Sequence, residues 1–325
     1  MRRPGILALT ALLAVGSSAS ARDFRTSDIY PPESPTVQAQ AYLGTIVERR
    51  SYGRLKVKAP AAGDRDSENY TIAQVRTGAL DMARVSLAAL NTSVPSTALL
   101  SAPFILNSSL QTQRVLEGEI GAEILADLEK HDLIGLCFYD AGARSIYTVD
   151  KPVRALSDTR GLRVRAQPGD IASTFWREFG AVPLAFPYSR IADGLRTHAL
   201  DAATGNWQSF VFGGHYRSVK FFTPSEHARP PGVLIFSRQV WKELPDADRE
   251  ILMLAARESA VHQRQLLEAF EVEARRTVEA AGVKIIDDFD KKSFRDPMEQ
   301  LYLKLYPEPQ QQRLLKRIQA AAGGS

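Results

Sequence analysis

Arg165 is the side chain in this sequence whose type and position best suit ligand binding. Residues 162–166 alternate between apolar and polar side chains, which predicts a half-buried β-strand with Arg163 and Arg165 on one face. A strand holds a guanidinium in a fixed direction, and its planar fork can bind a carboxylate through two parallel charge-assisted hydrogen bonds. The alternative is a structural ion pair with an acidic neighbour across the sheet. The pattern therefore predicts either a carboxylate site or an ion pair at Arg165.

Asn206 follows another strand of the same predicted unit. Strands at 162–166, 182–186 and 200–204 alternate with helical segments, which is a βαβαβ pattern. In open α/β sheets a ligand binds beyond the carboxyl ends of the strands, and Arg165 and Asn206 both fall there. Asn206 can give a ligand both a donor and an acceptor, although an asparagine here can also cap a loop. Trp207 beside it either stacks on an apolar ligand face or fills the core.

Other kinds of chemistry find little support in the sequence. The single cysteine, Cys137, lies in the apolar run 133–138 and is predicted to be a buried thiol, so no intramolecular disulfide can form. No nucleophile-elbow pattern occurs after the leader. None of the five histidines has the i, i+4 spacing of a zinc-binding helix (His131, His198, His215, His227 and His262). We expect no catalytic residue, no metal and no cofactor.

The N-terminal 21 residues have the pattern of a signal peptide. A basic start with Arg2 and Arg3 precedes a short apolar stretch and a small-residue cleavage site at 19–21, so we expect export to the periplasm. An uncleaved membrane anchor is the competing interpretation. The formal net charge of +4 falls to +2 without the two leader arginines, and basic and acidic residues are interleaved, so no nucleic-acid surface is predicted.

The remaining residues are enough for two α/β lobes, each with its own core. We predict helices at 34–50, 68–77 and 109–130, strands at 55–57 and 79–85, and a strand at 133–139 that is apolar enough to lie in the middle of a sheet. This last strand continues into Arg144, where the chain crosses between lobes and where an arginine can also form a hinge salt bridge. Strands at 220–222 and 233–236 cross back, and a helix from Pro245 to about residue 281 is long enough to brace both lobes.

Several motifs together resemble one family, the substrate-binding proteins of tripartite ATP-independent periplasmic (TRAP) transporters, the DctP-like family. The family's Gly-Leu-Lys-Ile-Arg-Val strand is similar to residues 161–166, and its Gln-Val-Arg-x-Gly-Ala-Leu-Asp-Met segment is similar to residues 74–82. Residues 138–145 (Phe-Tyr-Asp-Ala-Gly-Ala-Arg-Ser), 225–227 (Ser-Glu-His) and 240–241 (Val-Trp) match as well. The resemblance covers nearly the whole chain after the leader.

This resemblance implies a two-lobe clamshell that closes on its ligand, with the long helix bridging the lobes. We expect lobe I to comprise residues 22–142 plus 231–270 and lobe II residues 143–230 plus 271–325. The family makes Arg165 the residue that binds the ligand carboxylate, and we expect its partners in the site to be Arg144, Gln167, Asn206 and Glu68. The implied partner is a membrane permease of a small and a large subunit, driven by an ion gradient.

The likeness is greatest to the branch that binds sugar acids such as uronates. That branch carries Asp-Gly-Ala-Glu-Asn-Asn-Trp where this chain has Asp-Ala-Ala-Thr-Gly-Asn-Trp at 201–207, and it carries an acid at the position of Gly232. We therefore expect a carboxylate receptor rather than an enzyme, with a uronate-like sugar acid as its ligand and Thr204, Gly205 and Gly232 changing the pocket. The alternatives are a dicarboxylate or a keto or hydroxy acid, an exported two-domain α/β enzyme, or a sensory module.

Overall fold

The computed structural model describes residues 21–58, 61–62, 68–166 and 172–323. All but the last residue of the predicted signal peptide lies outside the described residues, and so does Gln167. Among the described residues, no helix combines the length and the apolar character needed to cross a membrane.

Lobe I, as we use the term, is built around a mixed five-stranded sheet in the order β4-β2-β5-β12-β6. Strand β2 pairs in parallel with both β4 and β5, whereas β12 runs antiparallel to both β5 and β6. The strand predicted at 55–57 is present as β3 (Leu55–Val57), but among the described strands its partner is β1 (Arg22–Phe24), in a separate two-stranded ribbon. The sheet strands are β2 (Thr26–Asp28), β4 (Ala61–Ala62), β5 (Met82–Ser86), β6 (Leu133–Tyr139) and β12 (Gly232–Ser237).

Lobe II is built around a six-stranded sheet in the order β13-β11-β7-β10-β8-β9. The parallel pairing of β8 with both β9 and β10 confirms the predicted βαβαβ unit. Strand β7 lies antiparallel between β10 and β11. The strands are β7 (Arg144–Thr148), β8 (Arg163–Ala166), β9 (Val182–Ala185), β10 (Ala202–Gly205), β11 (Phe221–Ala228) and β13 (Lys284–Ile285).

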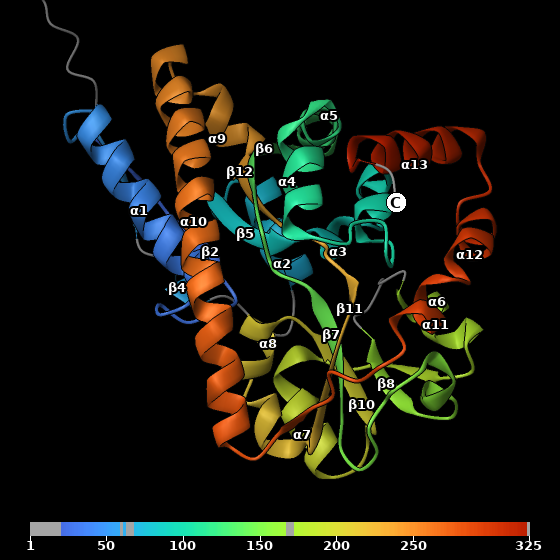
Figure 1. The fold of residues 1–325 in the computed structure, drawn as a ribbon. Coiled ribbons are helices and arrows are strands. Elements are labelled where there is room, and N and C mark those ends of the chain that lie inside the picture. The colour runs from blue at the N-terminus through green and yellow to red at the C-terminus, as the bar shows by residue number, and fades with distance from the viewer. Residues whose placement is uncertain (1–20, 59–60, 63–67, 167–171, 324–325) are drawn as a thin grey trace, which may run out of the picture.

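Two short connections and one long helix join the lobes (Figure 1). Residues 140–143 lead from β6 to β7, and residues 229–231 lead back from β11 to β12, as predicted. Helix α10 (Asp246–Ala280) is 35 residues long and packs against α1 (Pro35–Arg50) and β6 of lobe I and against α8 (Trp207–Phe212) of lobe II. The bridging role predicted for this helix is confirmed.

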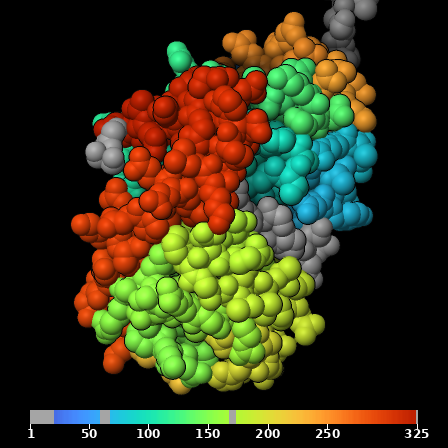
Figure 2. Space-filling view, turned by 90° about the vertical axis from the view of Figure 1, so that its right-hand side faces the viewer, coloured from blue at the N-terminus to red at the C-terminus, as the bar shows by residue number. Residues whose placement is uncertain are grey.

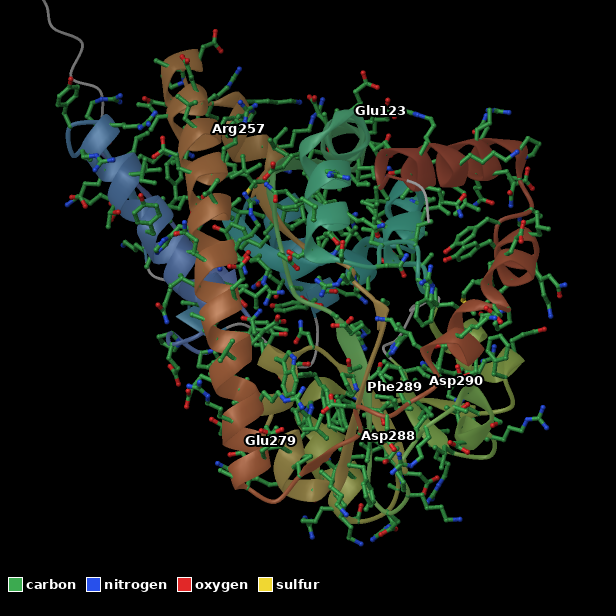
Figure 3. All side chains as sticks on the ribbon, viewed as in Figure 1. Glu123, Arg257, Glu279, Asp288, Phe289 and Asp290 are labelled. Carbon is green, nitrogen blue, oxygen red and sulfur yellow. The ribbon has the colours of Figure 1, made fainter. Side chains whose placement is uncertain are left out.

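The predicted lobe boundaries stay a proposal, with one correction at the C-terminus. Strand β13 does join the sheet of lobe II, but α13 (Pro309–Ala321) packs against α4 (Ser109–Glu117) and η1 (Pro95–Ser101), beside lobe I. Glu123 of α5 (Glu119–Asp127), which is labelled in Figure 3, accepts two hydrogen bonds, at 2.6 and 2.9 Å, from Arg317 of α13. The C-terminal segment thus covers one side of both lobes, as the red surface in Figure 2 shows.

The helix predicted at 109–130 is wrong as a single helix. It is divided into α4 (Ser109–Glu117), α5 (Glu119–Asp127) and the 3₁₀ turn η2 (Leu128–His131). Gly118 stands between the two helices in an extended conformation with ψ −168°. A side chain at Gly121 would overlap the backbone of Leu116, so the glycine allows the start of α5 to lie close against the end of α4.

The mid-sheet position predicted for residues 133–139 is also wrong, because β6 is an edge strand. Its apolar run has another cause: α10 covers one face, and α5 and η2 pack against the strand as well. A continuous run of apolar residues indicates that both faces of a strand are buried. It does not indicate whether the strand has a neighbour on one side or on both. Cys137 in this strand is a buried free thiol, as predicted.

The remaining helices complete the covering layers. Ser34 caps α1 as predicted, since its hydroxyl accepts a hydrogen bond from the amide of Val37 at 3.4 Å, and Pro35 occupies the first turn. The other α-helices are α2 (Glu68–Arg76), α3 (Leu87–Leu90), α6 (Ala172–Glu178), α7 (Ile191–Arg196), α9 (Arg238–Lys242), α11 (Lys291–Arg295) and α12 (Met298–Leu305).

Candidate ligand-binding site

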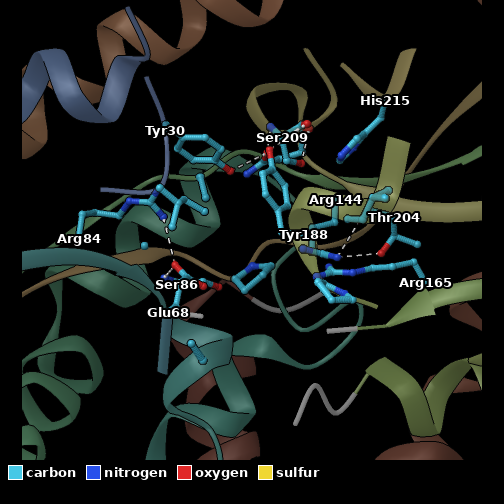
Figure 4. Close-up of a pocket in the computed structure, with 18 of the residues that line it drawn as sticks. Tyr30, Glu68, Arg84, Ser86, Arg144, Arg165, Tyr188, Thr204, Ser209 and His215 are labelled. Atoms are coloured by element: carbon cyan, nitrogen blue, oxygen red, sulfur yellow. Dashed lines mark hydrogen bonds and ion pairs between the residues drawn. The ribbon is translucent and has the colours of Figure 1, made fainter. Parts of the chain in front are cut away.

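A cavity lies between the lobes, at the strand ends where a ligand was expected (Figure 4). Its walls come from both lobes and from the two connections, which contribute Ala141, Pro230 and Pro231. Four of the five predicted site residues line it (Glu68, Arg144, Arg165 and Asn206). The fifth, Gln167, lies outside the described residues, so its place in the site stays a prediction.

Arg165 stands in β8 with only 6% of its surface exposed. Its Nε donates a hydrogen bond of 3.1 Å to the carbonyl of Phe186, which fixes the plane of the guanidinium at the cavity wall. Arg163 in the same strand forms a structural ion pair, since its Nη2 and Nε lie 2.7 and 2.8 Å from the carboxylate of Asp201. Arg163 therefore has a structural role, and Arg165 lines the cavity.

Arg144 begins β7 and lies beside β10 in the same sheet. Its Nη2 donates to the backbone oxygen of Thr204 at 2.9 Å and to the Thr204 hydroxyl at 2.8 Å. No carboxylate lies within ion-pair distance of it among the described residues, so the structure does not form the hinge salt bridge considered as its alternative role. Arg144 and Arg165 place two guanidinium groups on one wall of the cavity.

Asn206 caps α8, because its Oδ1 accepts a hydrogen bond of 2.8 Å from the amide of Ser209. The same oxygen accepts a long hydrogen bond of 3.5 Å from the hydroxyl of Tyr30, a lobe I residue, so this contact joins the two lobes. The capping role is thus confirmed, and the side-chain NH₂ group remains the donor that can serve a ligand. Trp207 fills the core: its ring stacks on Phe222 with centroids 4.3 Å apart.

Glu68 belongs to the lobe I wall at the first turn of α2. Its Oε1 accepts a hydrogen bond of 2.7 Å from the amide of Ser86 and lies 3.9 Å from Nη1 of Arg84. Its side chain is 11% exposed. Glu68 is the one acidic side chain among the described residues that line the cavity. The lobe I wall therefore holds a carboxylate, whereas the lobe II wall holds the guanidinium groups of Arg144 and Arg165.

Comparison with known proteins identifies the family. Residues 26–308 match the model of the DctP family, bacterial extracellular solute-binding protein family 7. The chain belongs to the DctP family. It is similar to a TRAP periplasmic solute-binding protein from Bradyrhizobium sp. BTAi1 in complex with D-galacturonate, with 39% identity, TM-score 0.88, and coverage of 92% of this chain and 100% of the other.

Two further relatives extend this comparison. A TRAP periplasmic solute-binding protein from Chromohalobacter salexigens with bound D-glucuronate has 31% identity and a TM-score of 0.87, with coverage of 92% of this chain and 99% of the other. The 2,3-diketo-L-gulonate-binding periplasmic protein of Escherichia coli is 25% identical over 78% of this chain and 77% of its own length. The predicted family and the two-lobe clamshell fold are confirmed, and members of the family are solute-binding proteins.

The lobe I wall of this DctP-family protein contains a buried ion pair that the sequence analysis missed. Arg84 in β5 and Asp28 in β2 meet through bonds of 2.7 Å (Nη2 to Oδ1) and 3.1 Å (Nε to Oδ2), and their side chains are 3% and 0% exposed. Gln40 donates to the same carboxylate at 2.7 Å, and the ring of Tyr30 lies 4.7 Å from the guanidinium carbon. The sequence could have indicated these two residues. Both stand near the ends of parallel strands, and the rule that ligands bind at strand ends is the one that located Arg165.

A second missed group lies on the lobe II wall and consists of Tyr188, Ser209 and His215. The hydroxyl of Tyr188 donates to the backbone oxygen of Ser209 at 3.2 Å. Burial, reinforced by the positive charge of Arg165, lowers the pKa of His215 to about 3, so the imidazole is neutral at ordinary pH. The histidines carried no spacing that marked them in the sequence, and only the fold brings His215 to the cavity.

Proposed function

We propose that this protein is a periplasmic receptor that binds a sugar acid, a uronate or a close analogue, and delivers it to a TRAP permease. The observation that carries the proposal is the unequal charge of the two walls: two guanidinium groups, Arg144 and Arg165, on lobe II and the acid Glu68 on lobe I. A ligand with a carboxylate at one end and hydroxyl groups at the other fits this arrangement. The D-galacturonate and D-glucuronate bound by similar proteins support it.

The ligand carboxylate would lie against Arg165, with Arg144 beside it. The two cations stand in β7 and β8, on either side of β10, and Arg165 is buried, so water competes little for the charged hydrogen bonds. Such a buried pair is favourable only when the remaining ligand oxygens also find partners. The NH₂ group of Asn206 and the hydroxyl of Ser209 lie on the same wall and can supply them.

The hydroxyl groups of the ligand would face lobe I. The Glu68 carboxylate can accept from a hydroxyl, and Arg84 can donate to one, because the charge of Arg84 is already balanced by Asp28. A second carboxylate in this place would approach Glu68 and be repelled. The charge pattern therefore favours a sugar acid over a dicarboxylate.

Closure of the lobes gives the receptor its mechanism. The ligand reaches both walls only when the lobes are together, so its binding free energy favours the closed state. The connections at 140–143 and 229–231 are the places where the chain can bend. A closed receptor that presents its shape to a permease needs no catalytic group, and we infer that the protein is a receptor and not an enzyme.

The test is isothermal titration of D-galacturonate, D-glucuronate and succinate into the purified protein and two variants. Arg165→Ala should weaken uronate binding at least about 100-fold, because it removes the buried partner of the carboxylate. Arg163→Ala is the matched control, since it stands two residues away in the same strand and pairs with Asp201. Near-normal uronate affinity in Arg165→Ala contradicts the proposed site, and tight binding of succinate with none of the uronates contradicts the proposed ligand.

A further inference from the structure

Thr204 stands between the two arginines of the lobe II wall. It lies in β10, the strand that separates β7 with Arg144 from β8 with Arg165, and 4% of its surface is exposed. The two hydrogen bonds that Arg144 donates, at 2.9 and 2.8 Å, both end on Thr204 (Figure 4). All three residues line the cavity, so the contact between Arg144 and Thr204 is part of the wall that a ligand meets.

Arg144 is held differently from two other strand arginines of this protein. Arg84 in β5 and Arg163 in β8 each pair with an aspartate at 2.7 Å. Arg144 instead donates to a backbone oxygen and a hydroxyl, both of which are neutral acceptors, and among the described residues it forms no ion pair. Its positive charge therefore has no balancing carboxylate in the part of the chain that the structure describes.

The bonds to Thr204 leave other donors of Arg144 for a ligand. A guanidinium has N–H donors on all three of its nitrogens. Nη2 donates to Thr204, and among the described residues Nε and Nη1 have no hydrogen-bond partner. Two acceptors on one nitrogen hold the guanidinium in place, and a donor that is already held loses less entropy when it binds a ligand.

The charges of the two arginines act on the same part of lobe II. Burial raises the pKa of Tyr147, and the positive charges of Arg165 and Arg144 both oppose that increase. Two like charges on one wall repel each other, and an anion bound by both removes that repulsion. A carboxylate in the place of the Thr204 hydroxyl would supply such an anion from the protein itself.

We propose that Thr204 is a positioning residue that holds Arg144 through neutral oxygens and so keeps the second charge of this wall available to the ligand carboxylate. The assignment rests on the proposed sugar-acid function. It also narrows the ligand class, because two uncancelled cations favour a free carboxylate over a lactone or an amide of the same sugar.

Titration of D-galacturonate and D-glucuronate into two variants of equal side-chain size tests the role of charge. Thr204→Asp places a carboxylate beside Arg144 and should weaken binding about 100-fold, because the ligand carboxylate then meets a like charge. Thr204→Asn is the matched control, since its side-chain oxygen is a neutral acceptor, and it should lose at most about tenfold. Equal affinity of the two variants overturns the proposal.

A double-mutant cycle measures whether Thr204 acts through Arg144. Thr204→Val removes the hydroxyl acceptor and should weaken uronate binding about fivefold, whereas Thr204→Ser keeps the hydroxyl and should recover most of that loss. In an Arg144→Gln background, Thr204→Val should cause no further loss, because no guanidinium is left to hold. Additive losses would mean that Thr204 acts independently of Arg144, and they would overturn the positioning role.

Urea unfolding of the unliganded protein tests the uncancelled charge without any ligand. At pH 7, Thr204→Asp should unfold at a higher urea concentration than Thr204→Asn, because its carboxylate balances Arg144, and Arg144→Gln should remove the difference. An equal or lower midpoint for Thr204→Asp overturns the proposal whatever the protein binds. Failure of the wild-type protein to bind either uronate overturns the proposed sugar acid instead, so the two failures are distinguishable.

Discussion

The half-buried carboxyl of Glu271 should make the stability of this protein fall as the pH rises toward neutrality. Glu271 stands on α10 at the connection from β6 to β7, so close to Gly142 that an added Cβ there would overlap its carboxyl oxygen. Burial raises its pKa from 4.5 to about 7. The positive charge of Arg229 lowers the pKa of Glu271. The nearby negative charges raise it, and these are Asp140, Glu226 and Glu268.

The sign and size of this pH effect on the free energy of unfolding follow from the linkage between proton binding and folding. Between pH 4.5 and 7 the folded protein keeps a proton on Glu271 that the unfolded chain has lost, so the free energy of unfolding decreases with pH in this window. A difference of 2.5 pKa units corresponds to about 3 kcal/mol, and partial exposure of the carboxyl to water reduces this to about 2 kcal/mol. Glu271→Gln cannot ionise, so the variant should gain about 2 kcal/mol over the wild-type protein at pH 7.5 and almost nothing at pH 4.5.

The assay is urea unfolding of the wild-type protein and two variants at four pH values between 4.5 and 7.5. Glu250→Gln is the control, because Glu250 is exposed near the start of the same helix, away from Glu271, and its substitution should leave the pH dependence unchanged. Parallel profiles for Glu271→Gln and the wild-type protein would refute the reasoning, since they would mean that Glu271 ionises equally in the folded and unfolded states.

Three further predictions follow from the buried groups. Asp28→Asn should lower the free energy of unfolding by about 3–5 kcal/mol, because Arg84 loses its buried carboxylate, whereas Asp193→Asn at an exposed pair should cost less than about 1 kcal/mol; urea unfolding measures both. Cys137 should react with a thiol reagent only after unfolding, because burial raises its pKa; immediate reaction of the native protein, followed by absorbance, would contradict this. Arg165→Lys should bind uronates much more weakly than the wild-type protein in a titration, because an ammonium cannot reproduce the guanidinium fork.

The parts of the site that the sequence predicted are those fixed by local periodicity. Arg165 and Asn206 lie at the cavity because the alternation of strands and helices between 162 and 204 determines which residues follow a strand end. Arg84 obeys the same rule in β5, but its pairing with Asp28 depends on two strands that lie 56 residues apart in the chain. Periodicity within one strand cannot reveal such a partner.

The errors in the predicted fold have a similar origin. The apolar run of β6 reports burial on both faces, and burial by helices gives the same pattern as burial between strands. The break at Gly118 follows from how α4 and α5 pack and not from their helical spacing, which continues across it. His215 illustrates the limit most clearly, since its place at the cavity depends on how lobe II packs, which sequence spacing does not encode.

The position of β12 has a consequence for how the chain folds during synthesis. This strand lies inside the sheet of lobe I, between β5 and β6, although residues 144–228 of lobe II separate it from β6 in the chain. The first sheet therefore stays incomplete, with β5 and β6 unpaired to each other, until the ribosome has made about three quarters of the protein. Loop-closure entropy makes such distant pairing slow. We expect the two lobes to fold as one late cooperative event, so a truncated chain that ends before Gly232 should acquire no stable lobe I.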